Sequence, residues 1–155
     1  MADESASWAR WSYAHQDLGE PPLPDGSPIL RPCVLIAPRG SDNRYLGVVD
    51  SGSPLTVADP VFLRACGVDL DAATPAMRVP LNLSGRWGEV PLFHVPVTLA
   101  APRDDAPPVE WTALIGARDN WRLPFGVLLG QRGWFDTFTT TIDASRTIVT
   151  VPPPA

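Results

Sequence analysis

The sequence predicts an all-β domain with very little helix, and three observations favour this class. Nineteen prolines and twelve glycines indicate many loops and leave little room for long helices. Apolar and polar residues alternate along Met77–Leu83 and again along Val90–Leu99, as in strands with one buried face. Short apolar runs such as Tyr45–Val49 and Trp111–Gly116 also have the length of strands and end at turn residues.

Composition indicates one globular domain and argues against several kinds of partner. A chain of 155 residues with 45% hydrophobic and 19% charged residues is able to bury a substantial core. The net charge of −5 and the absence of a basic block argue against nucleic-acid binding. The acidic N-terminus lacks the apolar core of a signal peptide, and no run reaches transmembrane length. We therefore expect a cytoplasmic protein that does not bind membranes.

The two cysteines, Cys33 and Cys66, indicate buried free thiols. They lack a CxxC spacing and have no histidine near them in sequence, so a disulfide is the less favoured alternative and a metal site is not expected. No cofactor is expected either.

Taken in order, the chain begins with a tail over residues 1–6. The aromatic-rich segment Trp8–Tyr13 is expected to be an edge strand or a swapped strand, and a loop over Gln16–Ser27 follows. The other expected elements outside the segments discussed below are a strand over Ile29–Ile36, a helical turn over Trp134–Phe138 and a final hairpin of Thr139–Ile142 with Thr147–Val151.

One short helix is expected over Asp59–Gly67. Asp59 is suited to capping its N-terminus, Pro60 fits the first helical position, and Gly67 is suited to ending it.

The most informative stretch runs from Leu46 to Val57. An apolar strand ends directly in Asp50, a polar turn follows, and the apolar pattern resumes at Leu55. A carboxylate at the end of a buried strand is costly to ionise unless donors surround it. The hydroxyl of Ser51 and the backbone N–H groups left accessible by Gly52 are expected to be those donors. The pattern indicates an acid held at the floor of a cleft, although an ordinary Asx-type turn has the same tripeptide.

A second apolar element far downstream, Val127-Leu128-Leu129-Gly130, gives this turn its context. The order and separation of Asp50-Ser51-Gly52-Ser53 and this element resemble the retropepsin-like aspartic proteases, single-domain relatives of retroviral protease. The likeness extends over residues 28–152, which we expect to be the retropepsin-like domain. Residues 1–27 are then an N-terminal tail and strand, and residues 153–155 a tail.

The resemblance implies a closed or partly open acid-protease β-barrel with a ψ-loop, a flap hairpin and one or two short helices. It makes Asp50 the catalytic acid and places Ser51 and Gly52 in the catalytic site with it. Ser51 is expected to hydrogen-bond to a second copy of the chain. The flap is expected at the hairpin tip Ser84–Glu89, where glycines let the chain bend and a tryptophan covers bound peptide, although an ordinary surface hairpin has the same pattern. The residues expected to contact substrate are Ser53, Gly85, Trp87, Gly88, Val127, Leu129 and Gly130.

Hydrolysis by aspartates needs two carboxyl groups, one taking a proton from water and the other giving a proton to the peptide carbonyl. The chain has a single Asp-Ser-Gly, so the second acid must come from a second copy across a two-fold axis. We therefore expect a homodimer whose terminal strands, Trp8–Tyr13 and Thr147–Val151, pair between chains. Its substrate is an extended peptide or unfolded protein that pairs by its backbone.

One departure from the family pattern follows Gly130. Gln131 stands where retroviral enzymes usually have arginine, and Arg132 is expected to replace that arginine one position later. Two other functions remain open. In the first alternative, the domain is a catalytically silent retropepsin-like module for dimerisation or peptide binding. In the second, it is an unrelated small β-barrel that binds an apolar ligand, with Asp50 in a plain turn.

Overall fold

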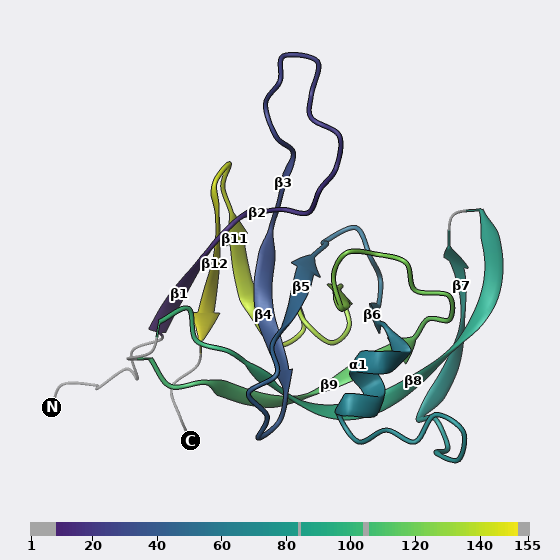
Figure 1. The fold of residues 1–155 in the computed structure, drawn as a ribbon. Helices are drawn as coiled ribbons and strands as arrows, with labels where there is room; N and C mark the ends of the chain where they lie inside the picture. Colours follow the sequence, from purple (N-terminus) through teal and green to yellow (C-terminus); the bar gives the residue numbers. More distant parts are fainter. Residues whose placement is uncertain (1–8, 84, 104–105, 152–155) are drawn as a thin grey trace, which may run out of the picture.

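Strands dominate the computed structural model, which describes residues 9–83, 85–103 and 106–151 (Figure 1). The elements are β1 (Ala9–Ala14), β2 (Gln16–Asp17), β3 (Leu30–Arg31), β4 (Cys33–Pro38), β5 (Tyr45–Val49), β6 (Thr56–Ala58), α1 (Pro60–Ala65), β7 (Met77–Leu83), β8 (Arg86–Leu99), β9 (Val109–Ala117), β10 (Val127–Leu129), β11 (Thr139–Ile142) and β12 (Arg146–Val151). Within these residues, no helix has the length and apolar character needed to cross a bilayer.

Six strands close into a barrel. They pair in the order β4-β5-β10-β6-β9-β8, and the far end of β8 pairs with β4, with Ile36 opposite Leu99. Strand β7 pairs only with β8 and lies outside this ring. The expected all-β barrel is confirmed.

The barrel is built around a crossing of distant segments. Strand β10 lies between β5 and β6, parallel to the first and antiparallel to the second, so that Leu128 pairs with both Val48 and Val57. The turn that joins β5 to β6 passes across the end of β10. This is the ψ-shaped arrangement that the resemblance to the retropepsin-like proteases implied.

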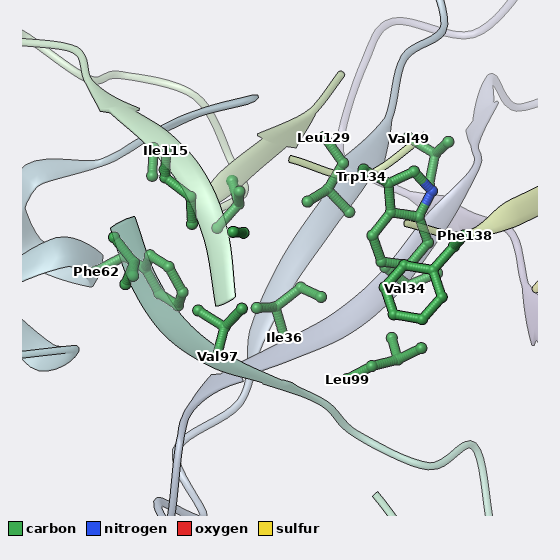
Figure 2. Close-up of a cluster of buried hydrophobic side chains, with 14 of the residues drawn as sticks. Val34, Ile36, Val49, Phe62, Val97, Leu99, Ile115, Leu129, Trp134 and Phe138 are labelled. Atoms are coloured by element: carbon green, nitrogen blue, oxygen red, sulfur yellow. The ribbon is translucent and has the colours of Figure 1, made fainter. Parts of the chain in front are cut away.

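The core fills the barrel with apolar side chains from all six of its strands. Val34, Ile36, Val97, Leu99 and Leu129 belong to one apolar cluster, which Figure 2 shows in close-up. Trp134 and Phe138, which follow the crossing, extend the core with ring centroids 4.6 Å apart. They form the expected single helical turn, in which the N–H of Phe138 donates to the carbonyl of Trp134 at 2.8 Å.

The one α-helix among the described residues has the predicted ends. The Oδ1 of Asp59 accepts from the N–H of Val61 at 3.0 Å, and Pro60 is the first helical residue. Gly67 follows the helix with φ of 87°, a backbone region that favours glycine.

The terminal strands pair within the chain. Strands β1, β12 and β11 form an antiparallel sheet in that order, with Trp11 opposite Val149. The hydroxyl of Tyr13 donates to the carbonyl of Ala100 at 2.6 Å and fastens this sheet to the end of β8. The two segments expected to pair between chains therefore pair with each other. Trp8 and the tails over residues 1–6 and 153–155 lie outside the described residues.

The β7–β8 hairpin differs from the expected flap tip. Leu83 pairs with Arg86, so the connecting turn has two residues, of which Gly85 has a φ of 82°. Gly88 pairs with Leu81 inside the sheet and does not belong to the tip. Because glycine at positive φ closes a two-residue turn, residues 86–89 stay paired and lengthen β8. Ser84 lies outside the described residues.

We predict that Gly130→Ala strongly destabilises the fold. A Cβ atom at this position would lie 2.2 Å from the carbonyl oxygen of Leu55 and 2.6 Å from that of Ser53. Both are backbone atoms, so the crossing must shift, at a cost of about 3 kcal/mol or more. Urea unfolding followed by circular dichroism measures this cost.

The matched control is Gly88→Ala, since no atom lies within 4 Å of a Cβ built there. Alanine in a strand interior is expected to leave stability unchanged or raise it by up to about 1 kcal/mol. Equal unfolding midpoints for the two variants would contradict the crossing described above.

Candidate active site

Asp50 lies at the end of β5, immediately after the buried Val48 and Val49, with its carboxylate exposed. Its N–H donates to the carbonyl of Leu129 at 2.9 Å, which ties the residue to the end of β10. Its Oδ1 accepts from the N–H of Gly52 at 2.9 Å. The carboxylate is therefore oriented by one backbone donor, and its second oxygen is open to a ligand.

Ser51 does not donate to the carboxylate as expected. Its hydroxyl makes no hydrogen bond within the part of the chain that the structure describes, and the Gly52 N–H alone supplies the expected donor. The carbonyl of Ser51 instead accepts from the Nε2 of Gln131 at 2.6 Å. The Gln131 N–H also donates to the carbonyl of Ser53 at 2.8 Å, so this residue holds the turn at two points.

Arg132, which was expected to replace the arginine of retroviral enzymes, makes contacts within its own chain, and its role in a dimer stays a prediction. The Nε of Arg132 lies 3.9 Å from the Oδ2 of Asp136, and its side chain is largely exposed. Its carbonyl accepts from the hydroxyl of Thr56 at 2.7 Å, and the same hydroxyl accepts from the N–H of Gly130 at 3.0 Å. The buried Thr56 thus stabilises the crossing from within the barrel, and the exposed Gln131 stabilises it from the surface.

A cavity of about 440 Å³ opens beside Asp50. Its walls combine apolar side chains with three charged groups, Asp50, Glu20 and Arg31. The apolar residues that line it are Leu18, Pro32, Val48, Val49, Leu123, Pro124, Phe125 and Leu128.

The residue of β10 that faces this cavity is Leu128, not Val127 or Leu129. Val127 and Leu129 are 0% and 2% exposed and belong to the core, so their expected role in substrate pockets is wrong. Successive side chains of a strand point to opposite faces, and the expectation chose the wrong face.

Ser53 and Gly130 are also absent from the cavity wall. The hydroxyl of Ser53 donates to the carbonyl of Leu55 at 2.7 Å and stabilises the turn. Gly130 is buried where only a residue without a side chain fits. Both residues shape the backbone around Asp50, and the expected contact of the partly exposed Ser53 with substrate stays a prediction.

The three expected flap residues do not line the cavity. Trp87 is 73% exposed, and Gly85 and Gly88 are exposed on the same hairpin. The hairpin stands on the side of the barrel opposite to the β1–β12–β11 sheet (Figure 1). Its inner face joins a second apolar cluster in which Val79 and Leu81 pack with Val57, Val90 and Leu92. Leu128 packs against the same cluster, so this cluster connects the hairpin to the cavity wall.

The thiols are unsuited to nucleophilic chemistry. Both cysteines are free, as expected. Burial raises the pKa of Cys33 to about 11 and that of Cys66 to about 12, so both are protonated near neutral pH. Among the residues described here, no group of three or more histidine, cysteine or acidic side chains is placed to hold a metal ion.

Sequence reasoning missed Leu128, Gln131, Glu20 and Arg31. Strand alternation indicates that Leu128 faces away from Val127 and Leu129, but no residue of this strand indicates which of the two faces is buried. For the other three, no local pattern marks their role, because each acts through a partner distant in sequence.

Comparisons with known proteins identify the fold. No family model and no curated protein matches the sequence. Among solved structures, the chain is similar to a retropepsin-like aspartic protease from Rickettsia conorii, with 12% identity, a TM-score of 0.60, and coverage of 99% of this chain and 100% of that one. A retroviral protease-like domain of Ddi1 from Leishmania major has 16% identity and a TM-score of 0.45, with coverage of 80% of this chain and 94% of that one.

The chain therefore has the retropepsin-like fold, the all-β acid-protease architecture that its two motifs predicted. At this identity, the likeness establishes the fold alone.

We predict that Leu129→Ala and Leu128→Ala differ sharply in stability. Truncating the buried Leu129 should cost about 2–5 kcal/mol, because it leaves a void inside the barrel. Truncating Leu128 should cost less than about half of that, since its side chain already borders an open cavity. Paired urea titrations measure both, and equal losses would contradict the assignment of faces.

Proposed function

We propose that the chain is an aspartic endopeptidase that acts as a homodimer, with one Asp50 from each copy at a shared active site. The observation that carries this proposal is the placement of Asp50. Its carboxylate sits at the mouth of the ψ crossing, oriented by the Gly52 N–H and open on one oxygen, beside a largely apolar cavity. The retropepsin-like fold supports the same reaction class.

The reaction needs one acid and one base, and in the proposed dimer an Asp50 from each copy supplies them. Two carboxyl groups in contact share one proton, because two negative charges side by side repel each other and only one group ionises readily. The ionised Asp50 takes a proton from water as the water oxygen adds to the peptide carbonyl carbon. The protonated Asp50 of the second copy gives its proton to the carbonyl oxygen. As the tetrahedral intermediate collapses and its C–N bond breaks, the leaving nitrogen takes up the proton that the first Asp50 gained from water. The second Asp50 takes back the proton of the intermediate's hydroxyl group as the carbonyl of the product acid forms, so the pair again shares one proton.

The dimer contact falls on the face that carries Asp50. Strands β1 and β12 already pair within the chain, so a sheet that exchanges them between copies is not needed to complete either one. A two-fold axis beside Asp50 brings the two carboxylates together and joins the two cavities into one cleft.

The substrate is an unfolded protein or extended peptide. Its backbone pairs with exposed strand edges beside the cleft, and an apolar side chain enters the cavity against Leu123, Phe125 and Leu128. The β7–β8 hairpin, with the exposed Trp87 near its end, covers the bound peptide.

We predict that Asp50→Asn abolishes cleavage of casein at acid pH and leaves the circular dichroism spectrum unchanged. The amide neither accepts the proton of water nor shares one with the second copy, so the rate falls at least about 100-fold. The exposed side chain contributes little to folding. Pepstatin is expected to inhibit the wild-type protein.

The matched control is Asp59→Asn, which makes the same chemical change at the start of α1. Asparagine also caps helices, so this variant is expected to cut at the wild-type rate. Cleavage by Asp50→Asn at the wild-type rate, or sedimentation as a strict monomer at assay concentration, contradicts the proposal. Dimers that bind peptide but cut nothing support the silent module instead.

A further inference from the structure

A charged pair, Glu20 and Arg31, borders the cavity beside Asp50. Arg31 lies at the end of β3, and Glu20 lies in the connection between β2 and β3, residues 18–29, which stands away from the barrel (Figure 1). The short ribbon in which Gln16 pairs with Arg31 and Asp17 with Leu30 brings the two side chains together.

The pair is bidentate. The Nε and Nη2 atoms of Arg31 donate to the Oε1 and Oε2 atoms of Glu20 at 2.5 and 2.7 Å. Both side chains keep contact with solvent, at 47% exposure for Arg31 and 29% for Glu20. Parallel hydrogen bonds of this kind fix the plane of the guanidinium as well as its position.

Arg31 also lies within the electrostatic field of Asp50. The hydrogen bond that Arg31 donates to Glu20 is the main cause that raises the pKa of Arg31, and the charge of Asp50 adds to it. The same hydrogen bond lowers the pKa of Glu20, which keeps Glu20 ionised in weakly acid solution. The charged groups that line the cavity are Glu20, Arg31 and Asp50, and the nearby thiol of Cys33 is neutral.

A bare cation in this position would oppose the proposed reaction. A positive charge next to two carboxyl groups favours the state in which both are ionised, and that state has no proton to give to the substrate. A carboxylate bound to the guanidinium cancels most of this field. The Glu20–Arg31 pair is placed to do this, because both of its members border the cavity.

We propose that Glu20 is a positioning residue of the active site, which holds Arg31 in a neutral pair and so lets the two Asp50 carboxyl groups share one proton. This inference rests on the proposed function. Glu20 acts through Arg31 and takes no part in the proton transfers. It acts by preventing Arg31 from pairing with Asp50.

The test is the pH dependence of kcat/KM for the cleavage of a casein-derived peptide by the Glu20→Gln variant. Without the Glu20 carboxylate, Arg31 turns toward Asp50. Both limbs of the pH profile then move to lower pH by roughly 0.5–1 pH unit. The double variant Glu20→Gln/Arg31→Gln removes the cation as well, and its profile returns to that of the wild type.

The matched control is Glu110→Gln, which removes the same charge from the Arg39–Glu110 pair, whose Nε–Oε2 distance is 3.6 Å and which does not border this cavity. Its profile is expected to match the wild type. An unshifted profile for Glu20→Gln, an equal shift for Glu110→Gln, or no return in the double variant would overturn the inference.

Carboxyl carbon NMR separates this inference from the proposed function. The midpoint of the Asp50 carboxyl titration is expected to move to lower pH in Glu20→Gln and to return in the double variant, even in a protein that cuts nothing. Cleavage with unmoved midpoints rejects the role of Glu20 and retains the protease. Moved midpoints without cleavage reject the protease and retain the electrostatic coupling.

Discussion

The insertion of β10 between β5 and β6 is the constraint on which the rest of the structure depends. Three residues, Val127–Leu129, satisfy backbone groups of two strands that are separated from them by about half of the chain. The carbonyl of Leu129 accepts from the N–H of Asp50, so the last hydrogen bond of this crossing also positions the acid. A buried strand must pair on both edges, so the insertion of β10 that completes the barrel also sets the position of Asp50.

Close packing at the crossing explains why small and hydroxyl-bearing residues surround it. Gly130 lies against two carbonyl oxygens, and the hydroxyl of Thr56 satisfies the Gly130 N–H and the Arg132 carbonyl at once. Gln131 then binds the outside of the turn through Ser51 and Ser53. These contacts fix the backbone around Asp50, while its carboxylate stays exposed. A rigid frame around a solvent-accessible acid is the geometry that general acid–base chemistry requires.

Some features could be predicted because they depend on neighbours in sequence. The cap at Asp59, the proline at the start of α1 and the glycine after it are local, and the structure has all three. The strand alternation of β7 and β8 and the acid at the end of β5 are equally local. The expected face of β10 was wrong because a three-residue apolar strand carries no polar residue to mark its outer side. The expected flap tip was too long because a two-residue turn at Gly85 keeps the following residues paired.

The sequence by itself determined the all-β class, the position of the turn that carries Asp50 and the limits of the helix, since each depends on local backbone preferences and side-chain alternation. Only the tertiary structure decided that Leu128 faces the cavity, that Gln131 holds the turn, that the terminal strands pair within one chain and that Arg31 is paired with Glu20 beside Asp50. These outcomes depend on which distant segments meet, and that is set by the closure of the barrel and not by any short pattern of residues.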